Sequence, residues 1–443
     1  MASFSKLPAE LLAEIVRLLC LQCTSRPGRR CFKSGCGHGC DNDLYKAEEI
    51  TTLANMCLVS KHLNQVATPH LYHRPLTSKW WLLARTLIAK PAIGFQIKHL
   101  CEVQWAWEAS QDFVASPLFP PEILPYYFKE YRALYDGRKL TLKHWQRHSP
   151  MAILLSLSPN LEELEAVQYE GPLDALLDED AAAFPRLRRV TISDWKKAGG
   201  LVFEDFDFLS LHAPNLTHLR CSSMGLVYEP QPCVPFKNIV ELRLDSCGVS
   251  VDGLDGLLQA CPNLRHFHYE AGGQNVCDEQ FTPYDAQTSF FYYAPDLVSL
   301  TMYMARITEY LAPAEIDDLV LLGDLTELTK LENLVLDIQC LIPPQEDPFS
   351  FIDGPAPVRV DPMMLVELLP PSIKSIRLVG DIVSGANLGM FRRPLASLAA
   401  VAAEKFPNLK KVQLVGEVGK GLERIKRTFE TAGVDVVGGD WGF

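Results

Sequence analysis

One short pattern recurs between residues 150 and 416 and constrains the fold more than any other feature of this chain. All copies but the one at Leu331 begin with a turn containing Pro or Asn, and every copy continues as L-x-x-L-x-L, with other apolar residues in place of some leucines. The spacing between successive copies is 26, 29, 23 and 25 residues and then lengthens to 33, 34, 42 and 36. The first apolar positions of the nine copies are Leu161, Leu187, Leu216, Ile239, Leu264, Leu297, Leu331, Ile373 and Leu409.

The shorter spacings fall within the period of about 20 to 29 residues that is typical of leucine-rich repeats. Segments such as VDGLDGLLQA, PMMLVELL and LASLAAVAAEKF lie between copies and carry apolar residues at helical spacing. A single unit cannot fold alone, because ordering a residue costs about 1.5 kcal/mol and each unit buries only a few aliphatic side chains. The sequence therefore predicts an α/β fold in which residues 150–443 form a solenoid, with parallel strands on the concave face and helices outside.

In L-x-x-L-x-L the named apolar residues point inward, so the alternate residues of each strand face the concave surface. The centre of that surface is dense in Arg, His and carboxylates, which permits either an acidic or phosphorylated partner segment or a basic one. A solvated ladder of mutually paired charges is the alternative. The candidate substrate-binding residues are His218, Arg220, Glu241, Arg243, Asp245, His266, His268, Glu270 and Tyr303.

The N-terminal residues predict a small helical module with more apolar surface than it can cover. Residues 10–19 place six aliphatic side chains on one wide helical arc, with Glu10, Glu14 and Arg17 opposite. A second helix is expected to end near Val59, and a third to begin after Ser60 as the N-cap and to stop at Pro69. So few residues cannot bury this arc themselves, so a partner is expected to cover the remainder.

The segments LPAELLAEIVRLL and LANMCLVSKHLNQVATPHLY resemble the F-box of filamentous-fungal F-box proteins. The resemblance implies an all-helical F-box module over residues 1–75 that docks onto a Skp-type adaptor, and through it onto a cullin, in an SCF-type ubiquitin ligase. It also implies that the C-terminal repeats hold a protein substrate. By the same resemblance, the residues that contact the adaptor are Leu7, Pro8, Leu11, Leu12, Ile15, Leu58 and Val59. The alternative is that these side chains only pack the core of the module.

A Cys-rich insertion at about residues 20–46 interrupts this module. Five cysteines and one histidine lie within 21 residues of this insertion, and thiolates and imidazoles this close in sequence suit tetrahedral zinc. A closed four-ligand site would fold a loop that has almost no core. The expected structural zinc ligands are Cys23, Cys31, Cys36 and Cys40, with His38 as the alternate. Cys20 continues the first helix and is expected to be buried. Unligated thiols are the competing interpretation, and the insertion could alter or block adaptor docking.

Residues 76–149 read as a linker and a degenerate capping repeat. The stretch KWWLLARTLIAKPAIGFQIKHLCEV predicts a helix, a turn and a strand that cover the open end of the repeat core.

The net charge of −12 argues against nucleic acid as a partner, because phosphate-backbone binding needs clustered Lys and Arg. No stretch predicts a signal peptide or a membrane span, so we expect a cytoplasmic or nuclear protein with reduced thiols. Because the sequence contains no catalytic motif, we expect a non-catalytic receptor subunit that needs no cofactor for chemistry. An interaction scaffold outside any ubiquitin ligase is the alternative function.

Overall fold

The computed structural model describes residues 7–20, 23, 42–75, 80–101, 154–155, 157–168, 184–194, 207–222, 225–226, 236–272, 281–304, 321–342, 360–380, 388–416 and 422–439. The chain divides into two compact units: residues 1–195 with 205–216, and residues 196–204 with 217–443. The fold is α/β, and every described strand pair is parallel. This agrees with the predicted class and is compatible with a solenoid.

The first unit begins with three helices that pack on one another, α1 (Ala9–Leu19), α3 (Asn42–Val59) and α4 (Lys61–His73). Their common core contains Val16, Leu53 and Ala67, one residue from each helix. Ser60 caps α4 as predicted, since its hydroxyl oxygen accepts a hydrogen bond from the Leu63 N–H at 3.1 Å.

The prediction that this helix stops at Pro69 is wrong, because α4 continues to His73 with Pro69 inside it. A proline within a helix removes one backbone hydrogen bond. Tertiary contacts hold the turn that follows: His73 is buried, and its carbonyl oxygen accepts a hydrogen bond from the Lys98 N–H at 3.0 Å.

The rest of the first unit confirms the helix, turn and strand predicted for the capping segment. Helices α5 (Trp80–Ala89) and α6 (Pro91–Gly94) precede strand β1 (His99–Cys101). Strand β1 pairs with β2 (Glu163–Gln168), and β2 pairs with β3 (Arg189–Asp194), which is followed by α11 (Asp207–His212). The two N-terminal copies of the repeat pattern thus form neighbouring strands beside the capping strand.

The second unit contains the remaining seven copies, each on its own strand, and the strands pair in chain order. These strands are β4 (His218–Ser222), β6 (Glu241–Val249), β7 (His266–Ala271), β8 (Ser299–Tyr303), β9 (Asn333–Asp337), β10 (Ser375–Val379) and β11 (Lys411–Val415). The short β5 (Gly225–Leu226) pairs with β6, and a strand that the repeat pattern does not mark, β12 (Asp435–Gly439), pairs with β11.

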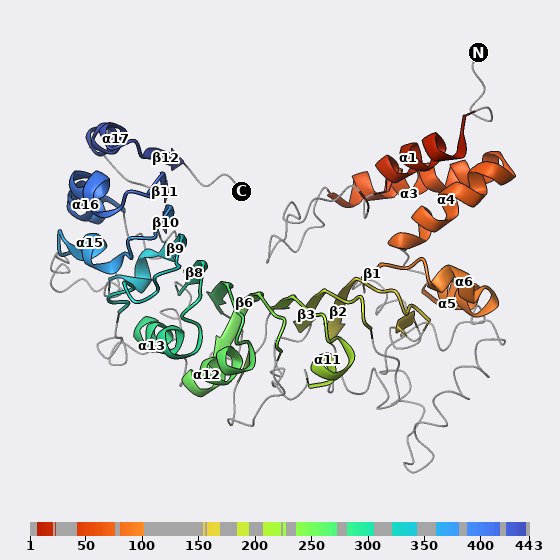
Figure 1. The fold of residues 1–443 in the computed structure, drawn as a ribbon, viewed down its shortest axis with the longest axis horizontal. Coiled ribbons are helices and arrows are strands. Elements are labelled where there is room, and N and C mark those ends of the chain that lie inside the picture. Colours follow the sequence, from red (N-terminus) through yellow and green to blue (C-terminus); the bar gives the residue numbers. More distant parts are fainter. Residues whose placement is uncertain are drawn as a thin grey trace, which may run out of the picture. The chain divides into compact units, whose positions relative to one another are not determined.

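Helices connect these strands on one side of the sheet in the second unit (Figure 1). They are α12 (Val251–Ala260), α13 (Pro283–Tyr293), α15 (Met364–Leu368), α16 (Arg392–Lys405) and α17 (Leu422–Thr431), with the 3-10 turns η5 (Ile338–Cys340) and η6 (Leu388–Phe391). The three segments predicted as helices correspond to α12, α15 and α16.

Strand register follows the repeat pattern position by position. Arg220 pairs with Arg243, and Arg243 pairs with His268. The same row continues through Thr301, Val335, Arg377 and Gln413. Consecutive copies of L-x-x-L-x-L therefore present equivalent positions side by side, as predicted.

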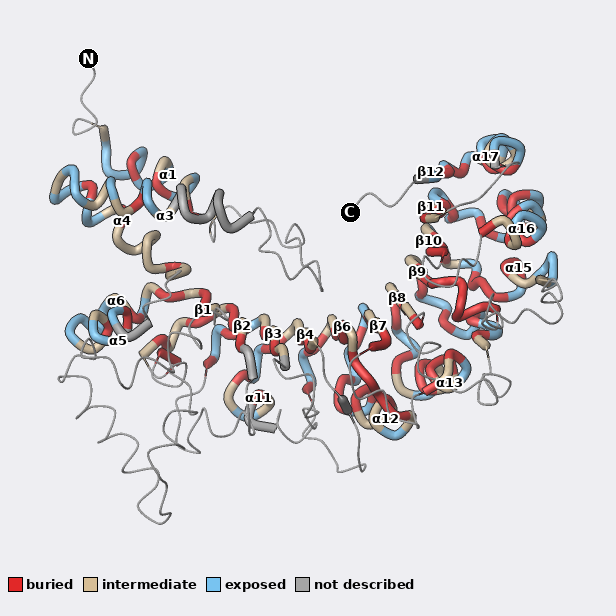
Figure 2. Tube along the Cα trace, turned by 180° about the vertical axis from the view of Figure 1, so that it is seen from behind, coloured by how far each residue is buried: buried red, intermediate tan, exposed pale blue. Residues whose placement is uncertain are grey.

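The core lies between the sheet and the helices in the second unit, where buried residues line the inner side of both (Figure 2). All nine leading apolar residues of the repeats are buried. The asparagine of the turn ties three copies to the preceding turn, because its side-chain amide donates to a backbone carbonyl there. These bonds run from Asn160 to Phe95, from Asn215 to Pro185 and from Asn263 to Lys237.

Among the described residues, no helix combines the length and the apolar character that crossing a membrane would require. The predicted domain boundaries at residues 75 and 149 stay predictions, because residues 76–79 and 102–153 lie outside the described part of the chain.

Candidate functional site

Two helices of the first unit carry large apolar side chains that the unit leaves in solvent. On α1, Leu11 is 54% exposed and Leu18 is 60% exposed. At the end of α3, Leu58 is 84% exposed and Val59 is 70% exposed. Leu11 and Leu18 are seven residues apart, two helical turns, and therefore share a face of α1 with the half-buried Ile15. We call Leu11, Leu18, Leu58 and Val59 the exposed apolar set.

The seven residues predicted to contact an adaptor divide by burial. Leu11, Leu58 and Val59 are exposed, as is Pro8, while Leu7 and Ile15 are half-buried. Leu12 is fully buried, so its side chain cannot meet a partner in this conformation. The wide apolar arc of α1 explains the difference, because one edge of it packs into the unit and the other edge faces outward. Leu18, which the prediction did not include, joins the exposed edge.

The predicted substrate face contains a compact charged cluster around Asp245. The side chain of Asp245 is fully buried. Its carboxylate accepts hydrogen bonds from Nε of Arg220 and from Nε of Arg243, the latter at 2.8 Å. Nε2 of His268 lies 3.2 Å from the same carboxylate. One carboxylate therefore holds side chains from three neighbouring strands.

The backbone of β6 is irregular directly beside Asp245. Strand register shifts between Leu244 and Cys247, and Ser246 has φ of 52°, in the left-handed region. An irregularity of this kind bends the strand and changes the direction of the side chains beside it. Burial raises the pKa of the Asp245 carboxyl, but the hydrogen bond with His268 and the charges of Arg220 and Arg243 outweigh it and lower the pKa to about 2. The carboxylate is therefore charged at neutral pH.

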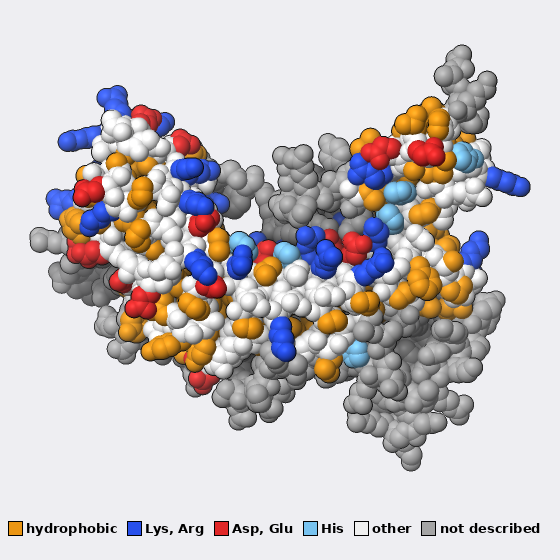
Figure 3. Space-filling model, viewed as in Figure 1, with side chains coloured by type: hydrophobic (Ala, Val, Ile, Leu, Met, Phe, Trp, Pro, Cys, Tyr) orange, Lys and Arg blue, Asp and Glu red, His pale blue; other side chains and the backbone are white. Residues whose placement is uncertain are grey.

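The other predicted face residues surround this cluster with weaker contacts. His218 Nε2 lies 3.4 Å from Oε2 of Glu241, and the ring of Tyr303 packs edge-on against His268 with centroids 5.7 Å apart. Glu270 accepts a hydrogen bond from the Ser246 hydroxyl at 3.5 Å, and His266 is exposed. Basic, acidic and histidine side chains gather along the strands of this unit (Figure 3). The paired charges agree in part with the predicted ladder.

The first unit holds a second buried polar group that sequence reasoning did not single out. His99 is fully buried between two carboxylates of β2, with Nε2 3.0 Å from Oε1 of Glu165 and Nδ1 3.5 Å from Oε2 of Glu163. Burial raises the pKa of Glu165, but His99 and Arg74 outweigh it, and the pKa is lowered. This buried charged group therefore lies at the end of the sheet, on strands β1 and β2.

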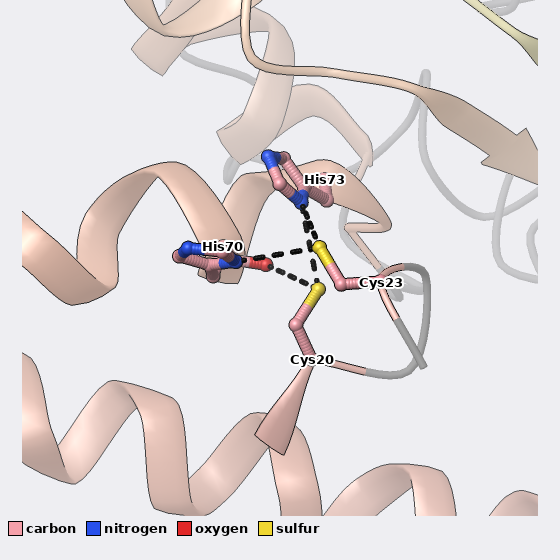
Figure 4. A group of neighbouring side chains, drawn as sticks. All are labelled: Cys20, Cys23, His70 and His73. Atoms are coloured by element: carbon pink, nitrogen blue, oxygen red, sulfur yellow. Dashed lines mark hydrogen bonds between the residues drawn. The ribbon is translucent and has the colours of Figure 1, made fainter. Parts of the chain in front are cut away.

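A group of four soft ligands lies where the first and last of the three packed helices end (Figure 4). The side chains of Cys20 and Cys23 follow α1, and two histidines sit on the last turn of α4. All four ligand atoms lie within 4.8 Å of one another. We call these residues the Cys/His group: Cys20, Cys23, His70 and His73.

Three sulfur to nitrogen distances define the geometry of the Cys/His group. Sγ of Cys20 lies 3.5 Å from Nδ1 of His73. Sγ of Cys23 lies 3.4 Å from Nδ1 of His73 and 3.5 Å from Nδ1 of His70. The pKa of His73 is lowered to about 4, mainly because the ring is buried and to a smaller extent because of the charges of Lys98 and His70. This imidazole is therefore neutral at physiological pH, which is the form that binds metals.

The structure places only one of the predicted zinc ligands in this group. Cys23 contributes to it, whereas Cys31, Cys36, Cys40 and the alternate His38 lie outside the described residues. Cys20 is buried as expected, yet it faces the histidines of α4. Sequence reasoning missed His70 and His73, although Cys20-x2-Cys23 followed by His70-x2-His73 pairs two short ligand spacings. None of the eight described cysteines forms a disulfide bond.

Neither models of known protein families nor curated protein sequences give a match to this chain.

Proposed function

We propose that this protein is the substrate-recognition subunit of an SCF-type ubiquitin ligase. The N-terminal helices would bind a Skp-type adaptor, and through it a cullin, while the leucine-rich repeats bind a protein substrate. The chain itself would perform no chemistry and need no cofactor for it. It would act in the cytoplasm or nucleus by raising the effective concentration of substrate lysines near the charged ubiquitin carrier.

The observation that carries this proposal is the exposed apolar set. Leu12 and Val16 already supply the core contacts of α1, so the outward leucines are not needed for packing within the unit. Four large aliphatic side chains in solvent on a small helical unit are typical of an interaction surface. The F-box resemblance of this segment names the partner that would cover them.

The repeats supply the second half of the proposal. Their strands offer one side chain per strand in register, and the Asp245 cluster holds two arginines and a histidine in fixed positions. Side chains that are already ordered lose less entropy when they bind a partner. A row of this kind suits recognition of a polar protein segment.

Binding of the full chain to a purified Skp-type adaptor tests the proposal. We expect wild type to bind, and the Leu11→Asp/Leu58→Asp variant to bind at least about tenfold more weakly, since each lost apolar contact is worth roughly 1.4 kcal/mol or more. Both positions are exposed, so the variant should keep the helical content of wild type.

Leu211→Asp is the matched control, because Leu211 is a 66% exposed leucine on α11 of the same unit. This control should bind the adaptor as wild type does. A wild-type chain that shows no adaptor binding would overturn the proposal and favour an interaction scaffold outside the ligase.

A further inference from the structure

The Cys/His group has the distances of a tetrahedral zinc site. With Zn–S bonds of about 2.3 Å and Zn–N bonds of about 2.0 Å, a sulfur and a nitrogen on the same tetrahedral ion lie about 3.5 Å apart. The three observed separations are 3.4, 3.5 and 3.5 Å. The ligand atoms therefore already stand where the corners of such a site would be.

The Cys20 thiol donates a hydrogen bond to the backbone carbonyl oxygen of His70 at 3.7 Å, so hydrogen bonding accounts for part of this arrangement. Nδ1 of His73 is within 3.5 Å of both sulfurs. A neutral imidazole nitrogen has either one lone pair or one proton to offer, so it can serve only one thiol at a time. A shared cation satisfies all four ligand atoms at once.

The elements that carry the ligands fix their relative positions. His70 and His73 are three residues apart on one helix, so their rings share a face and their centroids lie 4.8 Å apart. Cys20 closes the last turn of α1, where its N–H donates to the Arg17 carbonyl, and the Cys23 N–H donates to the Cys20 carbonyl at 3.0 Å. Two helix ends thus bring two ligands each.

We propose that the Cys/His group binds one zinc ion as a structural site that fastens the end of α1 to the end of α4. Four protein ligands leave no open coordination position, which distinguishes a structural site from a catalytic one. Two thiolates and two neutral imidazoles would balance the charge of the ion, and this suits a site in which Cys20 and His73 are buried. The assignment is independent of the proposed function.

Metal analysis of the full chain, purified without chelators from zinc-supplemented cells, tests the proposal. We expect one zinc per chain in wild type and a loss of most of it in the Cys23→Ser/His73→Ala variant. Cys57→Ser on α3 and His62→Ala on α4 are matched controls, because both residues lie in the three-helix part of the first unit and outside the Cys/His group. These controls should retain the zinc of wild type.

A second variant separates this site from one within the insertion. The chain with Cys31→Ser, Cys36→Ser, His38→Ala and Cys40→Ser should keep its zinc, because none of these residues is a ligand in the proposed site. Loss of zinc from this variant would overturn the assignment, as would a zinc-free wild type or a Cys20–Cys23 disulfide in the purified protein.

Cobalt substitution keeps the proposal testable even where a ligand variant fails to fold. Cobalt(II) in the wild-type chain should show the visible bands of a tetrahedral site and the charge-transfer absorption of two thiolates. His70→Cys preserves four soft ligands and should raise the charge-transfer absorption by about half, the increase from two thiolates to three. An octahedral cobalt spectrum, or an unchanged spectrum in His70→Cys, would contradict the site.

Discussion

Arg220 donates a hydrogen bond across two neighbouring strands to Asp245, whose carboxylate is fully buried on the polar side of the sheet. Arg243 and His268 approach the same carboxylate. The cluster therefore depends on one acidic side chain, and removing that side chain would leave two guanidinium groups without their shared partner.

We expect Asp245→Ala to lower the free energy of unfolding by about 2 to 4 kcal/mol, because breaking a buried ion pair from one side leaves a charge uncompensated. The Arg243 side chain is one-third exposed, so water can hydrate its guanidinium group in the variant. We therefore expect a smaller loss of stability than for a fully buried ion pair. Urea unfolding followed by circular dichroism measures it. Glu241→Ala on the same strand is the control and should change stability by less than about 0.5 kcal/mol, because Glu241 is 45% exposed. Equal effects of the two substitutions would contradict the cluster.

The same carboxylate makes stability depend on pH in the acid range. Its pKa is lowered from 3.8 to about 2 in the folded chain, so the unfolded chain binds the proton more readily. The stabilisation is present above about pH 4 and is lost as pH falls toward 2, with a total of about 2 kcal/mol. The difference in unfolding free energy between wild type and Asp245→Asn should shrink over this window. A constant difference between pH 5 and pH 2 would show that the carboxyl is not held in its charged form.

Two glycines predict opposite effects of the same substitution. A Cβ at Gly94 would lie 2.0 Å from the carbonyl oxygen of Leu157, a backbone atom that cannot swing aside. Gly94→Ala should therefore destabilise the first unit by about 1 to 3 kcal/mol. At Gly256, inside α12, a Cβ would meet nothing within 4 Å. Gly256→Ala should stabilise the second unit by about 0.5 to 1 kcal/mol, the usual gain from Gly to Ala within a helix. Thermal unfolding of both variants checks the pair, and a stable Gly94→Ala protein would refute the close approach.

Zinc removal should act locally. With the proposed site, a chelator should increase hydrogen exchange in the last turns of α1 and α4 and leave strands β9 to β11 unchanged, because the ligands all belong to the first unit. The Cys23→Ser variant should show this faster exchange without chelator and no further change with it. Unaltered exchange in both helices of the chelated wild type would speak against a structural role for the ion.

The strand rows could be predicted because the information is local and repeated. Each copy of L-x-x-L-x-L determines which of its residues point into the core and which point to the polar face. Parallel pairing of equivalent positions then makes neighbours of residues such as Arg243 and His268. The apolar arc of α1 also signalled a two-sided role, but only packing against α3 and α4 decides that Leu12 lies inside and Leu11 outside.

Features that depend on distant residues could not be predicted in this way. Cys20 and His73 are 53 residues apart and meet only because α1 and α4 end side by side. α4 continues past Pro69 to His73, whose carbonyl oxygen accepts a hydrogen bond from the N–H of Lys98, a residue 25 positions later in the chain. Alternation places Asp245 on the polar face, where the structure has it, but it does not predict that arginines of two strands close around the carboxylate and bury it.

The in-register row from Arg220 to Gln413 has a fixed spacing between its side chains. Neighbouring strands lie about 4.8 Å apart, so the row offers one side chain at that interval. A helix laid across the strands repeats a face about every 5.4 Å, whereas an extended chain repeats one only about every 6.6 Å. The side chains of a helical segment would therefore lie opposite the row on two or three successive strands. Those of an extended segment would be displaced from the row after fewer strands. The spacing of the sheet thus limits the conformation of whatever it holds, independently of charge.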